Sequence, residues 1–325
     1  MDFLKKIWRP LLALTLILVL IKKGPFQVDQ LKFILTHSSI VLLGFSIFFL
    51  QVLVASLRWK LFINLVEKVS LIKVFQLNLV GYFFNFFIPG GVGGDIVKAL
   101  ELSKNNQATK SQALSTVFSD RIFGLFSMIT FTLIFLSIEY FFHGAEFILK
   151  FLVLNGILFL TVVLSLLFFP AVLKKFSAHL SNKDSGWLLK LEKLVSSLHF
   201  TFVTFKNVKL QAKSFVLSFL GQLITIYFMF EVVRALGAQP PSFLVFFSLC
   251  CFSFVASAIP IFPAGIGVGQ VAIYAMFSQF NEELAKATIT AITTVQIFNL
   301  FYALIGGAIF SFMPKVKSEP ESSLI

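Results

Sequence analysis

The stretch Pro89-Gly90-Gly91-Val92-Gly93-Gly94-Asp95-Ile96-Val97-Lys98 interrupts a long apolar run that begins near residue 74. Proline and glycine break a helix here, because proline has no backbone N–H to donate and glycine tolerates a positive φ. The next helix would start near Asp95, whose carboxylate suits the positive end of a helix dipole. The stretch therefore predicts two short helices joined by irregular backbone, and not one continuous helix.

A second break of the same kind lies in the second half of the chain. The apolar run that begins near residue 243 stops at Pro260-Ile261-Phe262-Pro263-Ala264-Gly265-Ile266-Gly267-Val268-Gly269-Gln270. Two prolines and three spaced glycines again indicate irregular backbone beside a helix start. Gln270 occupies the place here that Asp95 occupies in the first break.

The composition around these breaks predicts an all-α integral membrane protein. The chain of 325 residues is 58% hydrophobic and 13% charged, whereas a soluble domain is about 45–50% apolar and about a quarter charged. The unbroken apolar runs approach 20 residues, roughly the length that spans the hydrocarbon core as a helix. We predict six full transmembrane helices, plus two re-entrant broken-helix hairpins, with the full spans at 8–22, 38–57, 121–138, 148–169, 213–233 and 287–312.

The first of these spans has the basic, then apolar, pattern of a signal peptide. No small-residue cleavage site follows it, and Lys22-Lys23-Gly24 does. We therefore expect it to be retained as the first transmembrane helix.

The distribution of basic residues gives an orientation. If the N-terminus is cytoplasmic and each broken run enters and leaves on one side, the cytoplasmic segments hold 21 of the 27 Lys and Arg residues. Threading the broken runs straight through would instead place residues 170–213, with eight basic residues, outside. The positive-inside rule therefore favours re-entrant hairpins, with both termini cytoplasmic in the cell (inner) membrane.

This topology predicts an inverted repeat within one polytopic membrane domain, 1–325. The halves would cover about 1–142 and 148–313, with a cytoplasmic amphipathic linker at 170–212 and a disordered tail at 314–325. Broken helices at matching positions of inverted halves are typical of a transporter site near the bilayer midplane. The alternative is that the glycines only allow helices to pack closely.

Charged residues at and after the first break are the main candidates for a substrate site. Asp120 and Arg121 are neighbours on one helix and cannot face each other, so each needs its own partner. Asp120 with Lys98, or Asp95 with Arg121, fits this requirement; a helix N-cap and an interfacial lysine are the alternative reading of Asp95 and Lys98. The candidate substrate-binding set is Asp95, Lys98, Asp120, Arg121, Gly91, Gly93, Gly94, Gly265, Gly267 and Gln270.

Two further polar pairs form a secondary set. Glu231 and Arg234 are three residues apart and can pair on one helix face, although snorkelling at the end of their span is the alternative. Gln296 and Asn299 share a face of the last span. Polar residues in such positions more often hold helices together than bind substrate.

Other site chemistries find no support. The net charge of +12 fits basic cytoplasmic loops and contact with anionic headgroups, and we expect no nucleic-acid partner. The adjacent Cys250 and Cys251 and the scattered histidines offer no metal-ligand spacing. The glycine-rich break is no P-loop, since no Gly-Lys-Ser/Thr follows it. We expect no metal and no cofactor.

Three pieces of the sequence resemble, in order, the lysylphosphatidylglycerol synthase transmembrane-region family, also called flippase-like membrane proteins. They are Pro-Gly-x-x-Gly-Gly-Asp-x-x-Lys at 89–98, Asp-Arg-Ile-Phe-Gly-Leu at 120–125 and Pro-Ala-Gly-Ile-Gly-Val-Gly-Gln at 263–270. The resemblance covers nearly the whole chain and implies an inner-membrane protein linked to moving amphiphilic lipids between leaflets. In the two-part synthases such a region flips an aminoacylated phospholipid made by an attached soluble domain, which we do not expect in this chain.

The chain departs from the family pattern at two positions. Lys98 stands where the resemblance implies Arg, and Gln270 stands where it implies Glu. The loss of that carboxylate puts in doubt a role of the second break in binding a cationic headgroup or in proton coupling.

We therefore expect a lipid flippase or transporter and not an enzyme. Its partners would be membrane lipids, either an anionic phospholipid or a lipid-linked headgroup, and a homo-oligomer or an envelope-enzyme partner is compatible with the sequence. One alternative is a membrane-embedded transferase acting on a lipid carrier, for which the chain lacks an Asp-x-Asp pair and a histidine beside a carboxylate. The other is a non-transporting partner subunit of an envelope lipid enzyme.

Overall fold

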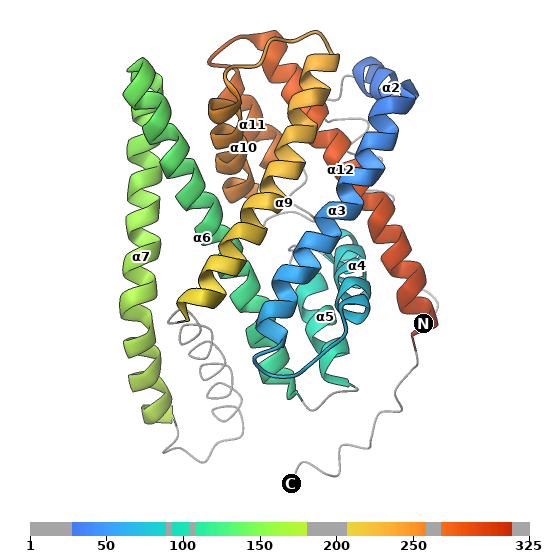
Figure 1. The fold of residues 1–325 in the computed structure, drawn as a ribbon, viewed down its shortest axis with the longest axis vertical. Coiled ribbons are helices and arrows are strands. Elements are labelled where there is room, and N and C mark those ends of the chain that lie inside the picture. Colours follow the sequence, from blue (N-terminus) through green and yellow to red (C-terminus); the bar gives the residue numbers. More distant parts are fainter. Residues whose placement is uncertain (1–27, 89–92, 105–107, 181–206, 258–267, 314–325) are drawn as a thin grey trace, which may run out of the picture.

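The computed structural model describes residues 28–88, 93–104, 108–180, 207–257 and 268–313, and all regular structure in these ranges is helical (Figure 1). The all-α prediction is thus confirmed there, while the expected span 8–22 and tail 314–325 lie outside the described residues. The helices are α2 Val28–Thr36, α3 Ser38–Ile63, α4 Leu71–Phe87, α5 Gly93–Lys104, α6 Lys110–His143, α7 Glu146–Leu180, α9 Val208–Ala235, α10 Phe243–Ser257, α11 Val268–Phe277 and α12 Glu282–Phe312.

Five of these helices are, by length and composition, able to cross a membrane. They are α3, α6, α9, α12 and the Glu146–Phe168 part of α7. Four of them contain an expected span, Glu146–Phe168 matches the expected span 148–169 to within one residue at its end, and each is longer than the roughly 20 residues that the hydrocarbon core requires. The short helices α4, α10 and α11 are apolar but too short to cross alone.

Side-chain caps explain where the long helices begin and end. Thr109 accepts a hydrogen bond from the backbone of Gln112, whose side chain accepts one from the Thr109 N–H, so a reciprocal capping box starts α6. The same helix ends at Gly144, whose φ of 62° is the left-handed conformation that glycine adopts without strain. These local signals set the two ends of α6, which runs without a break from Lys110 to His143.

The predicted boundary between span 148–169 and the linker 170–212 is wrong. Helix α7 continues through Pro170 to Leu180, and residues 208–212 belong to α9. A proline removes only one N–H from the helix, and the rest of the ladder can continue past it. The part of the expected amphipathic linker between 181 and 206 lies outside the described residues.

The short helices form two pairs at opposite ends of the long ones. In Figure 1, α4 and α5 lie in the lower half, and α10 and α11 lie in the upper half. The contacts of the pairs correspond: α5 packs against α6 and α11 against α12, while α4 packs against α12 and α10 against α6. Helices α3 and α9, which precede the pairs, pack against each other.

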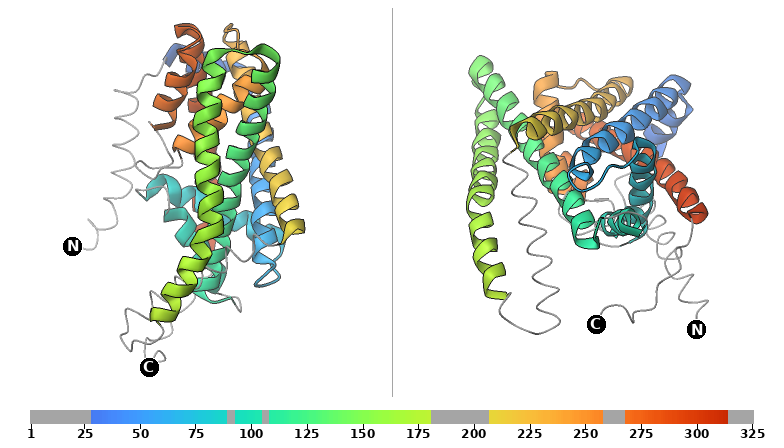
Figure 2. Two further views of the ribbon diagram at one scale, coloured as in Figure 1. Left: turned by 90° about the vertical axis from the view of Figure 1, so that its left-hand side faces the viewer. Right: turned by 60° about the horizontal axis from the view of Figure 1, so that its bottom comes forward.

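Helix α7 lies on the outside of the bundle beside α6, at the left in Figure 1 and nearest the viewer in the left panel of Figure 2. Its outward side chains are large and apolar, and Ile157, Leu160 and Leu167 are each more than half exposed. A soluble monomer seldom exposes so continuous an apolar surface. The surface of α7 therefore fits contact with lipid.

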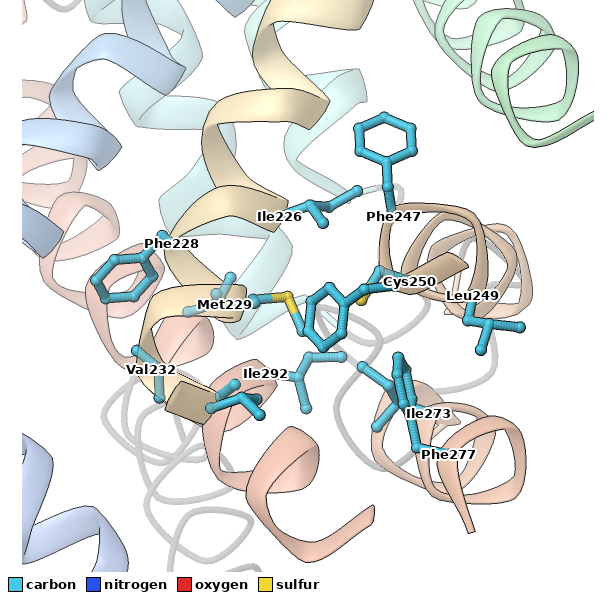
Figure 3. Packing of buried hydrophobic residues seen from close by; sticks show 14 of the residues in the cluster. Ile226, Phe228, Met229, Val232, Phe247, Leu249, Cys250, Ile273, Phe277 and Ile292 are labelled. Atoms are coloured by element: carbon cyan, nitrogen blue, oxygen red, sulfur yellow. The ribbon is translucent and has the colours of Figure 1, made fainter. Parts of the chain in front are cut away.

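The helices share one large apolar core, and α9, α10, α11 and α12 contribute much of it. Figure 3 shows side chains of α9 (Ile226, Phe228, Met229, Val232), α10 (Phe247, Leu249, Cys250), α11 (Ile273, Phe277) and α12 (Ile292) packed together. Cys250 and its neighbour Cys251 are free, fully buried thiols in this cluster. The core fixes the second pair of short helices against the long ones.

Candidate functional site

Five charged side chains gather at the end of the bundle that holds α4 and α5. They are Asp95 and Lys98 of α5, Asp120 and Arg121 of α6, and Arg58 of α3. Asp95, Lys98 and Asp120 are each less than 10% exposed, whereas the Arg121 side chain is 54% exposed. Buried charges are stable only with partners, so the pairing inside this cluster determines its properties.

Asp95 lies between two cations. The Arg121 guanidinium donates from Nε to Oδ2 at 2.8 Å and from Nη2 to Oδ1 at 3.1 Å. Lys98 Nζ lies 3.3 Å from Oδ1. Of the two pairings considered from the sequence, the structure contains Asp95 with Arg121, and the i,i+3 geometry of α5 adds Lys98 to the same carboxylate.

Asp120 has a different partner, which sequence reasoning missed. Arg58 donates from Nε to Asp120 Oδ1 at 2.8 Å and from Nη2 to Oδ2 at 3.1 Å. The remaining terminal nitrogen, Nη1, donates to Ser218 Oγ of α9 at 3.0 Å. This pair and the Ser218 contact join α3, α6 and α9.

Lys98 is surrounded by groups that stabilise a buried ammonium. Its Nζ donates to Asn78 Oδ1 at 3.4 Å and lies 4.6 Å from the centre of the Trp59 ring. An ammonium over an indole face is attracted by the ring quadrupole. The Asn78 amide in turn donates to Ser56 Oγ at 3.0 Å, so α3 and α4 both supply polar groups to this end of α5.

The glycines of the first break allow close packing of backbone. Helix α5 begins at Gly93, which places Asp95 in its first turn, as the sequence predicts. Gly94 packs directly against Gly81 of α4, and its N–H donates to the Asn85 side chain at 2.9 Å. Gly91 lies outside the described residues. Close packing therefore explains why residues 93 and 94 are glycines. This was the alternative to a substrate-binding role for them.

The second pair of short helices has a neutral polar contact where the first has charges. Gln270 of α11 donates from Nε2 to Gln296 Oε1 of α12 at 2.6 Å, and Gln270 is 4% exposed. Two candidates that are far apart in the sequence thus meet. Asn299 is half-buried one turn further along α12, and Gly265 and Gly267 lie outside the described part of the chain.

Glu231 and Arg234 lie at the other end of the bundle from the charged cluster. Arg234 Nη1 donates to Glu231 Oε1 at 3.3 Å, so the expected pair forms. The pair borders a shallow groove of about 430 Å³ between α3 and α9. The Arg234 side chain is 59% exposed, which also fits snorkelling at the end of the helix.

A buried carboxylate at another position, Glu139, also escaped the sequence analysis. It is 5% exposed, accepts a hydrogen bond from the Ser242 hydroxyl at the start of α10, and lies 2.9 Å from His143 Nδ1. Arg58 and Glu139 each follow directly after an expected span, 38–57 and 121–138. The expected spans stop just before these two charged residues, whereas α3 and α6 continue past them. An ionisable residue directly after an apolar run is a signal for a paired or functional group inside a longer helix.

No group of three or more His, Cys, Asp and Glu side chains within the described ranges is arranged to hold a metal ion.

Comparisons with known proteins give the following matches. The profile of the lysylphosphatidylglycerol synthase TM region matches residues 7–306. The UPF0104 membrane protein MJ1595 of Methanocaldococcus jannaschii is 26% identical over 273 aligned residues, which cover 76% of each chain. No solved structure matches the chain.

Proposed function

This chain belongs to the lysylphosphatidylglycerol synthase TM region family of membrane proteins, as its sequence motifs predict, and from that premise we propose that it moves an amphiphilic lipid between the leaflets of the cell membrane. The observation that supports the proposal is the presence of two separate polar sites among long apolar helices: a charged cluster on α3, α5 and α6, and a neutral polar contact between α11 and α12. A polar headgroup needs such groups because hydrocarbon alone cannot solvate it.

We infer that the two short pairs are re-entrant hairpins of an inverted repeat. Under this reading α3–α6 corresponds to α9–α12, and α4–α5 enters the membrane from the side opposite to α10–α11. The equivalent contacts of the pairs, α4 with α12 and α10 with α6, support this correspondence. In secondary transporters, such discontinuous helices at a repeat interface surround the substrate.

The proposed roles follow from charge. Arg121, Lys98 and Asp95 would receive the headgroup at one side of the membrane, and Gln270 with Gln296 would meet it at the other. The acyl chains would stay in the bilayer, against apolar surfaces such as that of α7. Asp120 would act indirectly, because its carboxylate is occupied by Arg58.

The basic residues support an orientation for this arrangement. The segments that carry 21 of the 27 Lys and Arg residues would be cytoplasmic, together with both termini. The charged cluster would then open towards the cytoplasm, and the Gln270–Gln296 contact would lie in the outer half of an inner membrane.

Reconstitution tests the proposal. The purified full-length chain is placed in proteoliposomes that contain fluorescent lipids with a panel of headgroups, and lipid in the outer leaflet is quenched chemically over time. We expect faster exposure of at least one lipid than in protein-free vesicles. Asp95→Asn and Arg121→Ala should slow that movement, because each removes one side of the Asp95–Arg121 ion pair.

Lys150→Gln is the matched control, since Lys150 is 74% exposed and pairs with Glu146 on its own helix. It removes a positive charge without touching the charged cluster and should leave the rate unchanged. Equal rates in the wild type and in correctly folded Asp95→Asn and Arg121→Ala variants would refute the site assignment. Movement of no lipid in the panel would refute the transport proposal.

A further inference from the structure

The charged cluster contains two arginine–aspartate pairs of the same geometry. In each pair, Nε and Nη2 of the arginine donate to the two oxygens of the carboxylate. The distances are 2.8 and 3.1 Å for Arg58 with Asp120, and 2.8 and 3.1 Å for Arg121 with Asp95. Each aspartate therefore holds one edge of a planar guanidinium group and fixes its plane.

The two pairs differ at the third nitrogen. Nη1 of Arg58 donates to Ser218 Oγ, and the Arg58 side chain is 19% exposed. Nη1 of Arg121 has no hydrogen-bond partner among the residues that the structure describes, and the Arg121 side chain is 54% exposed. The edge formed by Nη1 and Nη2 is thus closed in Arg58 and open in Arg121.

Charge counting shows which kind of group suits the open edge. Asp95 carries one negative formal charge and is shared by two cations, Arg121 and Lys98. The three side chains together carry a formal charge of +1. A monoanion bound at Arg121 would neutralise the net charge of these three side chains, whereas a cationic ligand would be repelled.

We propose that the open edge of Arg121 binds the phosphate of a lipid headgroup, and that Asp95 stays on the other edge to hold the guanidinium plane. The proposal rests on the proposed function for the lipid, and it names the substrate class as a phosphodiester. Two parallel N–H bonds from the edge match two phosphate oxygens, the geometry for which arginine is preferred over lysine. A diester carries one negative charge, equal to the excess on the three side chains, whereas a monoester carries about 1.5 to 2.

In this arrangement Arg121 is the binding residue and Asp95 is a positioning residue. No existing bond has to break when the phosphate arrives, because the Asp95 bonds use Nε and one hydrogen of Nη2. Lys98 is held by Asn78 and Trp59. It adds a positive charge next to the Asp95 carboxylate.

Calorimetric titration of the detergent-purified full-length chain tests this assignment. The ligands are dihexanoyl phosphatidylglycerol, dihexanoylglycerol without phosphate, and inorganic phosphate. The wild type should bind the phosphatidylglycerol more tightly than the other two. Arg121→Lys keeps the charge and loses the two-pronged edge, so its affinity for the phosphatidylglycerol should fall about tenfold or more.

Arg58→Lys is the matched control, since it makes the same exchange in the closed pair. It should lower the unfolding temperature, because it breaks a three-helix contact, and should leave the affinity unchanged. Arg121→Lys should lower the affinity for phosphatidylglycerol and leave the unfolding temperature unchanged. Asp95→Asn should weaken phosphatidylglycerol binding less than Arg121→Lys, because the edge remains but its orientation is lost.

Three results would overturn the assignment: wild-type affinity in Arg121→Lys, equal loss of affinity in Arg58→Lys, or equal binding of dihexanoylglycerol. Inorganic phosphate that binds as tightly as the lipid would assign the edge to free phosphate and remove the lipid headgroup from the proposal. Binding is measured here without transport. Phosphatidylglycerol binding that depends on Arg121 without any lipid movement would therefore refute the proposed function alone, and movement with unchanged Arg121→Lys affinity would refute this inference alone.

Discussion

Gly94 of α5 lies so close to Gly81 of α4 that a Cβ atom built on Gly94 would stand 1.9 Å from the Gly81 carbonyl oxygen. Only hydrogen fits between the two backbones. This contact fixes the position of the first turn of α5, and Asp95, the next residue, is thereby placed beside Arg121. The backbone packing of α4 against α5 and the ion pair of the site are therefore parts of one arrangement.

Gly94→Ala should destabilise the protein by about 1–3 kcal/mol, the usual cost of overpacking, because the α4 backbone must move to admit a methyl group. It should also weaken any function that depends on Asp95. Gly156→Ala is the control, since its Cβ would meet only Leu133 Cδ1 at 4.0 Å. Thermal unfolding in detergent compares the two, and equal midpoints would contradict the packing argument.

Asn85→Ala should loosen the start of α5. The Asn85 side chain accepts a hydrogen bond from the Gly94 N–H at 2.9 Å, and N–H groups of a first helical turn have no partner within the helix. Loss of such a cap costs about 1 kcal/mol. Hydrogen exchange measured by mass spectrometry should become faster in residues 93–104. Asn64→Ala, at an exposed position after α3, should leave that exchange rate unchanged.

Asp120→Leu should destabilise the fold by roughly 3–5 kcal/mol, because it leaves the Arg58 guanidinium largely buried without its carboxylate. The double variant Arg58→Met/Asp120→Leu should be more stable than Asp120→Leu alone, since both charges are then gone. Denaturant unfolding of the two single variants and the double variant gives the coupling energy. A double variant that is merely the sum of the singles would show that the pair contributes nothing to stability.

Cysteine labelling checks the topology. Lys150→Cys and Val208→Cys replace side chains that are each 74% exposed. Under the re-entrant arrangement an impermeant maleimide should label Lys150→Cys in intact cells and Val208→Cys only after permeabilisation. Hairpins threaded straight through would give the opposite pattern. The native Cys250 and Cys251 are fully buried and should remain unlabelled in the folded protein, so they need no replacement.

The sequence predicted the elements whose signal is local. Apolar runs near 20 residues predicted the five described long helices, and the breaks at Pro89–Gly94 and Pro260–Pro263 predicted the two pairs of short ones. These features depend on hydrophobicity and backbone conformation, which neighbouring residues determine.

Helix ends and the partners of charged residues were less predictable. The predicted spans 38–57 and 121–138 stop before Arg58 and Glu139, because an apolar run in the sequence ends at a charged residue. A helix continues through a charge when another helix neutralises or hydrogen-bonds it, as Asp120 does for Arg58 and Ser242 does for Glu139. The predicted linker likewise includes Pro170, although α7 continues beyond this residue to Leu180.

By itself, therefore, the sequence determined that this is a helical membrane protein of its family, with charged residues at the first break and a glutamine at the second. Only the tertiary structure decided which arginine is closed and which is open. Arg58 is capped by Ser218, 160 positions away in the chain, while Arg121 keeps one edge exposed. Contacts between helices so distant in sequence depend on how the bundle packs, and local periodicity carries no information about that packing.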